Sequence, residues 1–224
     1  MTATTEKPNM TALLSAVDSL PLEFFTAYRG GYPNSIGLAL VDAVYSIQAS
    51  YDSEHSGKGV LNRVKQFRSD HSNAVDDLCV LADLDEDAIQ KVMGEGKTSQ
   101  RTKSGAVLEA ARALAALEPP IVRAADFTAE RREDARGAYT RVHGLGKVTF
   151  TYFTMHLGVP GVKADSLLTR FVARHAYGDK SLKLSSDHVV ALVNQAYESR
   201  PQIAETVTHF EHALWRAESK GDAN

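Results

Sequence analysis

The sequence contains a single cysteine, Cys79, among 224 residues. One thiol cannot form an intramolecular disulfide, nor can it supply the four thiolates of an iron–sulfur cluster. Such scarcity is typical of a reducing compartment. The sequence also lacks an apolar run long enough to cross a membrane, and its first residues have neither the basic start nor the apolar core of a secretion signal. We therefore expect a cytoplasmic protein with no membrane partner.

The sequence has no excess of positive charge, because 25 Lys and Arg stand against 28 Asp and Glu, a net charge of −3. This balance excludes a protein that coats nucleic acid by bulk charge, but it allows a local basic face. No histidine pair has metal-ligand spacing with carboxylates, so we predict no metal site. With 43% hydrophobic and 24% charged residues, the chain has the composition of a globular protein.

Apolar residues recur at helical spacing along almost the whole chain, and alternating patterns are scarce. Prolines and glycines separate the periodic segments; Pro119 and Pro120, for example, end an alanine-rich segment at 102–117. We predict an all-α fold of about ten to twelve helices. Residues 1–12 are expected to form a disordered lead.

Two glycines, Gly144 and Gly146, form a Gly-x-Gly turn between two predicted helices. Glycine allows unusual backbone angles and lets the main chain approach another molecule closely. The amides at the start of the following helix have no intrahelical partner, so together with Lys147 they could hold a phosphate oxygen. The alternative is a tight turn with no ligand.

A lone acid, Asp165, follows about twenty residues later at another predicted helix start. Cleavage of an N-glycosidic bond develops positive charge on the sugar, and a fixed carboxylate nearby lowers that barrier. The alternative role is a helix N-cap, and one residue can serve both purposes. We expect Arg170, in the same helix, to order a neighbouring carboxylate or helix end.

Residues 141–174 resemble the helix-hairpin-helix DNA glycosylases, the superfamily of endonuclease III, the adenine and 8-oxoguanine glycosylases and the bacterial alkyladenine glycosylases. The resemblance implies that residues after the lead form one two-lobed helical unit with a DNA-binding cleft between the lobes. One lobe would run from about 40 to 150, with the hairpin at 142–148. The other would join 13–39 to 151–224. It also implies that Asp165 is catalytic.

The resemblance extends to three further contacts with DNA. The segment 44–50 is similar to an endonuclease III pattern whose Gln fills the gap left by the extruded nucleotide, a role that would fall to Gln48. Residues 97–103 resemble a basic loop of the family, and His143 stands where the family often has proline. For each, a solvated side chain or a helix cap is the alternative. The predicted DNA-binding residues are Gly144, Gly146, Lys147, His143, Gln48, Lys97 and Arg101.

A pocket that stacks on a flipped base needs aromatic side chains. We predict Tyr45 and Tyr28 in this pocket, with core packing as the alternative for Tyr45. The C-terminal segment 210–215 is expected to be a packing helix.

Val148 stands where bifunctional members of the superfamily carry a nucleophilic lysine that forms a Schiff base. Lys147 lies one residue earlier, a rotation of about 100° on a helix, and is expected to point at phosphate instead. The resemblance therefore implies a monofunctional enzyme that uses water and no cofactor.

The leading hypothesis is a monomeric, nucleoid-associated DNA glycosylase of base excision repair. It would remove a damaged or modified base from double-stranded DNA by base flipping and Asp165-assisted hydrolysis. One alternative is a non-catalytic helix-hairpin-helix DNA-binding protein. Another is an interaction protein that uses the same scaffold for protein contacts.

Overall fold

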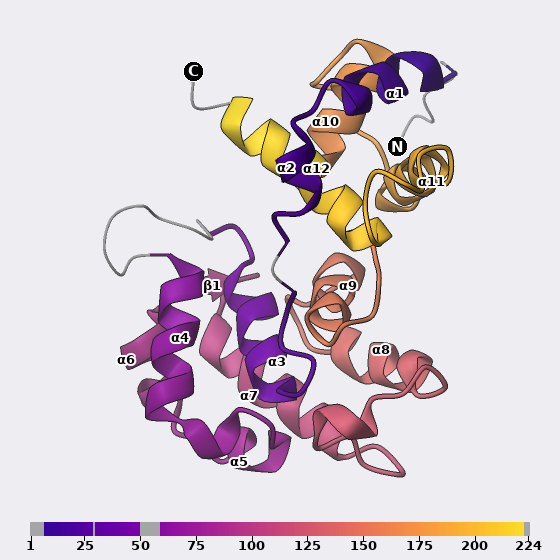
Figure 1. Ribbon diagram of the computed structural model, residues 1–224. Coiled ribbons are helices and arrows are strands. Elements are labelled where there is room, and N and C mark those ends of the chain that lie inside the picture. Colours follow the sequence, from indigo (N-terminus) through magenta and orange to yellow (C-terminus); the bar gives the residue numbers. More distant parts are fainter. Residues whose placement is uncertain (1–6, 29, 50–58, 222–224) are drawn as a thin grey trace. The chain divides into compact units, whose positions relative to one another are not determined.

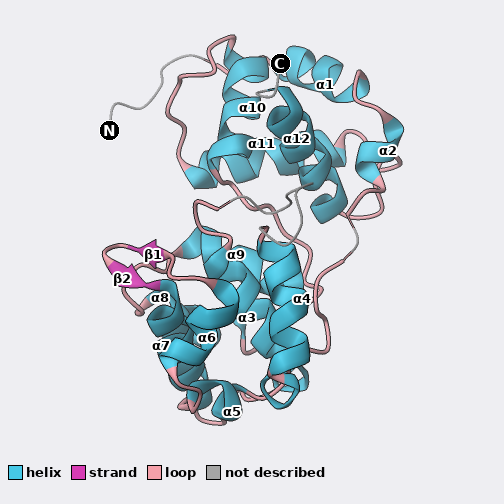
Figure 2. Ribbon diagram, turned by 90° about the vertical axis from the view of Figure 1, so that its left-hand side faces the viewer, coloured by secondary structure: helices cyan, strands magenta, loops and turns pink. Residues whose placement is uncertain are grey.

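The computed structural model describes residues 7–28, 30–49 and 59–221 (Figure 1). Helices make up nearly all of its regular structure, and one two-stranded antiparallel hairpin is the exception among these residues (Figure 2). The prediction of an all-α fold is confirmed. The chain divides into two compact units: a continuous unit of residues 30–159, and a split unit of residues 1–29 and 160–224.

The continuous unit contains most of the helices and the hairpin. Its elements are α3 (Ile36–Tyr45), α4 (Val60–Asp70), η1 (Ser72–Ala74), α5 (Leu78–Ala82), α6 (Glu86–Met93), β1 (Lys97–Thr98), β2 (Arg101–Thr102), α7 (Lys103–Ala115), η2 (Ala124–Asp126), α8 (Arg132–Thr140) and α9 (Lys147–His156). Every residue of α3 is buried, because α4, α5, α7 and α9 all pack against this apolar helix.

The burial of α3 explains why the observed unit boundaries differ from the predicted lobes. Residues 30–39 and 151–159 were expected beside the C-terminal helices, yet both stretches belong to the continuous unit. They do so because α3 and α9 pack on each other in its core. The boundaries fall after Arg29 and after Val159.

The split unit consists of the remaining helices around a second hydrophobic core. Its elements are α1 (Met10–Asp18), α2 (Leu22–Phe25), α10 (Ser166–Tyr177), α11 (Ser186–Glu198) and α12 (Val207–Gly221). Helix α12 packs against α2, α10 and α11, with the Phe25 and Phe210 rings 5.9 Å apart at the centre.

Helix α1 begins earlier than the sequence suggested. The Asn9 side chain accepts a hydrogen bond from the Ala12 amide at 3.0 Å, a standard N-cap. Because this cap starts the helix at Met10, the predicted disordered lead was too long: residues 10–12 are helical. Residues 1–6 of the predicted lead lie outside the described residues.

A buried carboxylate, Asp42, anchors the middle of α3. It accepts hydrogen bonds from the Tyr32 hydroxyl at 2.8 Å and the Ser46 hydroxyl at 2.9 Å, and its Oδ1 lies 3.3 Å from His156 Nε2. Burial alone would raise the pKa of the Asp42 carboxyl, but His156 and the two hydroxyl donors lower it below its ordinary value. The network ties α3 to the end of α9.

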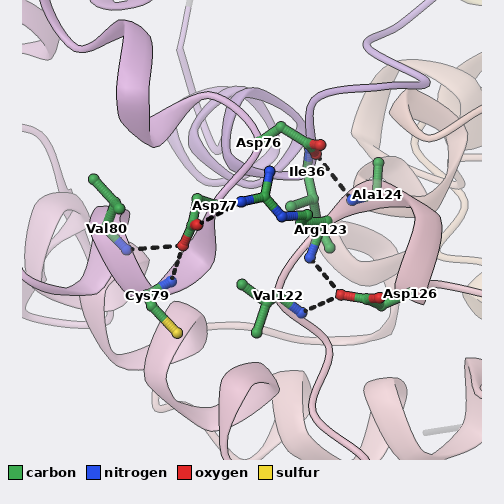
Figure 3. Close-up of polar contacts among 9 residues, drawn as sticks. All are labelled: Ile36, Asp76, Asp77, Cys79, Val80, Val122, Arg123, Ala124 and Asp126. Atoms are coloured by element: carbon green, nitrogen blue, oxygen red, sulfur yellow. Dashed lines mark hydrogen bonds and ion pairs between the residues drawn. The ribbon is translucent and has the colours of Figure 1, made fainter.

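Three aspartates form the polar contacts between the starts of α3, α5 and η2, and one of them, Asp76, contacts α3 itself (Figure 3). Asp76 Oδ1 accepts from the Ile36 amide at 3.1 Å and from the Ala124 amide at 2.9 Å. Neighbouring Asp77 caps α5, while Asp126 accepts from two amides at the start of η2. Asp76 is therefore the group that joins α3 to η2.

We predict that Asp76→Ala lowers the free energy of unfolding by about 2 kcal/mol, since it leaves two amides without an acceptor. Asp77→Ala is the matched control and should cost about 1 kcal/mol, the usual loss of a helix cap. Urea unfolding followed by circular dichroism measures both. Equal losses in the two variants would contradict a joining role for Asp76.

Candidate nucleic-acid interface and candidate active site

The predicted Gly-x-Gly turn lies between α8 and α9 in the continuous unit. Gly144 has a φ of +90°, and an added Cβ would lie 3.0 Å from Thr98 Cγ2. Its carbonyl oxygen accepts a hydrogen bond from the Thr98 hydroxyl at 3.0 Å. Val142 and Leu145 are buried and hold the turn to the core. The fold itself therefore requires glycine at position 144.

Gly146 is different, because nothing in the fold requires glycine there. Its φ of −141° is available to any residue, and an added Cβ would meet no atom within 4 Å. It is the exposed N-cap of α9, followed by exposed Lys147 and half-buried Val148. The first amides of a helix lack intrahelical acceptors. The open side of Gly146 leaves space for another molecule to approach these amides.

The predicted basic loop at 97–103 is a β-hairpin, a feature the sequence analysis missed. Lys97 pairs with Thr102, and Thr98 with Arg101. The two turn residues, Ser99 and Gln100, both have positive φ, +45° and +70°, as a type I′ turn requires. The Asn-Gly or Asp-Gly pair that usually announces this turn is absent.

The hairpin and the Gly-x-Gly turn contact each other. His143 Nε2 lies 3.1 Å from the Ser99 carbonyl oxygen and donates to it, beside the Thr98–Gly144 bond. His143 thus binds the hairpin rather than capping α8. Lys97 and Lys147 are exposed, whereas Arg101 forms an ion pair with Glu109 at 2.7 Å.

The segment that carries Gln48 is also joined to this region. The Lys103 ammonium, at the first position of α7 directly after the hairpin, donates to the carbonyl oxygens of Tyr45, at 3.0 Å, and Ile47. Burial lowers the pKa of Lys103. Gln48 follows with a φ of +48° and an exposed side chain. The Gln48 segment, the β-hairpin and the Gly-x-Gly turn, all predicted to bind DNA, are therefore joined within the continuous unit.

Tyr45 lies in the core of the continuous unit, which favours the packing alternative over a base pocket. Its side chain is 4% exposed, and its hydroxyl donates to the Gly94 carbonyl oxygen at 3.3 Å. Burial raises the pKa of Tyr45 to about 12. A ring fixed in this way cannot stack on a base, so we do not retain Tyr45 in the candidate site.

Asp165 belongs to the split unit, where it caps α10. Its Oδ1 accepts from the amides of Leu167 and Leu168 at 3.0 and 3.1 Å. Its Oδ2 accepts from Trp215 Nε1 at 3.2 Å and lies 3.7 Å from the Lys163 ammonium. The side chain remains 22% exposed. Three hydrogen-bond donors and one ion pair thus fix a carboxylate that solvent still reaches.

A cluster of aromatic rings begins at Trp215, the hydrogen-bond donor to Asp165. Trp215 is stacked on His212, with ring centroids 5.8 Å apart and planes at 14°. His212 in turn lies 5.5 Å from Tyr28, whose ring meets His209 edge-on at the same distance. Tyr28, predicted for the base pocket, therefore lies in the same cluster as the predicted catalytic acid.

The His212 imidazole is neutral at neutral pH. Burial is the largest cause that lowers its pKa to about 4, and the neighbouring Arg216, His209 and Lys163 act in the same direction. A neutral imidazole both donates and accepts hydrogen bonds. The His212 ring therefore offers both an aromatic face and hydrogen-bonding nitrogens close to Asp165.

The C-terminal helix is therefore more than the packing helix expected from the sequence. His209, His212 and Trp215 recur every three residues, so they lie along one side of α12. That spacing was a signal available in the sequence. Arg170 behaves as expected, since its Nε binds the buried Glu218 at 3.0 Å.

Within the described residues, no group of three or more His, Cys, Asp or Glu side chains is placed to hold a metal ion. No helix there combines the length and apolar character that crossing a membrane would need.

The comparisons place the chain in a family and a fold. A family model described as a domain of unknown function, DUF8548, matches residues 12–219. No curated protein matches the sequence. Among solved structures, the chain resembles a thermostable thymine-DNA glycosylase, with 15% identity over 94% of this chain and 86% of that one and a TM-score of 0.56. This likeness shows the fold alone. The chain belongs to the DUF8548 family and has the helical fold of a DNA glycosylase.

Proposed function

We propose that this protein is a monofunctional DNA glycosylase that removes a damaged or modified base from double-stranded DNA. The observation that carries the proposal is the setting of Asp165. Its carboxylate is fixed by two helix amides and the Trp215 indole, yet it is partly exposed beside an aromatic cluster. The glycosylase fold supports the same assignment.

In the proposed reaction the bond between the base and C1′ of the sugar breaks, and its electron pair leaves with the base. Asp165 stabilises the positive charge that develops at C1′. A water molecule then adds to C1′, and the proton it loses balances the charge of the departing base. The products are the free base and an abasic site. A carboxylate held in place by preformed donors needs no reorganisation during this step.

The aromatic cluster is the proposed site for the extruded base. Tyr28 and Trp215 offer ring faces for stacking, and neutral His212 offers a donor and an acceptor to the edge of a base. An enzyme that acts on a base must rotate it out of the duplex. We propose that Gln48, exposed in the turn three residues after α3, fills the gap that the base leaves.

Phosphate binding is assigned to the helix-hairpin-helix formed by α8, the turn and α9. The amides after Gly146 and the Lys147 ammonium would hold a phosphate oxygen. Lys97 on the adjoining hairpin adds a second exposed cation. Arg101 is a weaker candidate because Glu109 neutralises it. These charges form a local basic face on a protein of net negative charge.

We predict that Asp165→Asn lowers the single-turnover rate of base excision by about 10²–10³-fold, because it removes the charge that stabilises the sugar cation. Asparagine keeps the N-cap of α10 through its one oxygen. Its NH2 group cannot accept from Trp215 Nε1, so the variant should lose that bond but retain the fold and the DNA affinity. A panel of lesion-bearing duplexes treated with alkali reveals abasic sites. Full activity of the variant would exclude catalysis by Asp165; DNA binding without excision by the wild type would indicate the non-catalytic alternative.

We predict that Gly146→Ala folds normally but binds duplex DNA about tenfold more weakly, a loss of about 1.4 kcal/mol. The added methyl group meets open space in the protein and would obstruct only a ligand. Gly144→Ala is the contrasting variant and should lower thermal stability, because Gly144 has positive φ. Fluorescence anisotropy and thermal melting measure the two effects. Unchanged affinity of Gly146→Ala would remove the turn from the interface.

We predict that the wild-type protein leaves intact abasic strands. Val148 cannot form a Schiff base, so no amine is available at the position used by bifunctional relatives. Borohydride added during the reaction should trap no covalent protein–DNA adduct. A trapped adduct would show that another amine acts as a nucleophile.

A further inference from the structure

Two cations of α12, Arg216 and Lys220, contact the same aromatic ring. Phe24 of α2 is 8% exposed, and its ring centroid lies 5.1 Å from Arg216 Cζ and 4.8 Å from Lys220 Nζ. The negative face of an aromatic ring attracts a cation at such distances. The two cations are four residues apart, so they also lie on one side of α12. Phe24 thus holds two positive charges in one place.

This pair of charges is not neutralised within the described part of the chain, where no carboxylate forms an ion pair with Arg216 or Lys220. Glu218 lies between them in the sequence but about 200° around the helix. It faces α10 instead, where its Oε1 binds Arg170 at 3.0 Å and Arg174 at 2.9 Å. The two cations over Phe24 therefore form a site with an excess of positive charge.

Folding alone gives little reason for this excess. Like charges one turn apart destabilise a helix. Lys220 lies in the last turn of α12, where the helix dipole favours a cation, but Arg216 lies one turn earlier. Arg216 donates no hydrogen bond to any described residue, although its Nε is buried. The guanidinium therefore lacks an acceptor, and an anion would supply both the acceptor and the missing charge.

The position of Arg216 indicates which anion fits. It follows Trp215, the indole that binds Asp165, and lies one helical turn after His212, whose pKa it helps to lower. These are the rings proposed to hold the extruded base. An extruded nucleotide rotates about its backbone, so the phosphates on either side of its sugar stay close to the base. Guanidinium and ammonium groups are the usual partners of such phosphates.

We propose that Arg216 and Lys220 form a second phosphate-binding site, which holds the backbone of the strand that carries the extruded nucleotide. The proposal deepens the proposed function and rests on it for the identity of the strand as DNA. The first phosphate site, at Gly146 and Lys147, belongs to the continuous unit, whereas this one belongs to the split unit. Each unit then binds the DNA backbone through cations of its own.

The salt dependence of DNA binding tests this site without any excision. The probe is a duplex with one tetrahydrofuran abasic site, whose sugar can be extruded whichever base the protein removes. Each phosphate contact contributes about 0.9 to the slope of log K against log[NaCl]. Arg216→Gln and Lys220→Gln should each make the slope shallower by about 0.9, and at about 0.1 M NaCl each should bind about eightfold more weakly.

Two further variants separate a phosphate contact from other effects. Lys180→Gln removes an exposed lysine elsewhere in the split unit and should leave the slope unchanged. Arg216→Lys keeps the charge and should keep the wild-type slope, which a loss of packing on Phe24 would not allow. Thermal melting checks that each variant is folded.

The possible results distinguish this proposal from the proposed function. Wild-type slopes in both Arg216→Gln and Lys220→Gln would overturn the second phosphate site, even if the protein excises a base. A loss of equal size in Lys180→Gln would overturn it too, because the effect would then be one of overall charge. A wild type that shows the expected slopes but excises no base from the lesion panel would refute the glycosylase and leave the phosphate site supported.

Discussion

The Lys103 ammonium is the contact on which the arrangement of the continuous unit depends. It is almost fully buried and donates to two carbonyl oxygens at the end of α3. The last carbonyls of a helix have no partner within it, so a cation there satisfies them and complements the helix dipole. Because Lys103 directly follows the β-hairpin, this one contact brings the Gln48 segment to the hairpin. The hairpin in turn contacts the Gly-x-Gly turn.

In the split unit a charged side chain again binds free backbone groups of a helix, this time an acid at the start of the helix. Asp165 satisfies two free amides of α10, and this capping role is what holds its carboxylate still. Structural capping and the proposed catalysis are therefore not competing explanations. One oxygen binds the helix, while the other binds Trp215 and faces Lys163. The helix start supplies the rigidity that a preorganised electrostatic catalyst requires.

Much of this organisation could be predicted from residues close together in the sequence. Helical periodicity, the glycines of the turn and the acid at the start of α10 are local signals, and each depends on backbone preferences within a few residues. The β-hairpin could not be predicted in this way, because its positive-φ residues are Ser99 and Gln100 rather than a residue pair typical of the turn. Tyr45 was misplaced although the residues before it in α3 are apolar on almost every side of the helix, which is the pattern of a fully buried helix.

The sequence by itself determined the helices, their caps and the kinds of side chain available to form a site. Only the tertiary structure decided which of those groups meet. Trp215 reaches Asp165 from 50 residues away, and Thr98 reaches Gly144 from 46. The buried Glu218 likewise meets Arg170 and Arg174 from 48 and 44 residues away. A protonation state depends on how much water and how many opposite charges surround the group, and both are set by packing between distant segments.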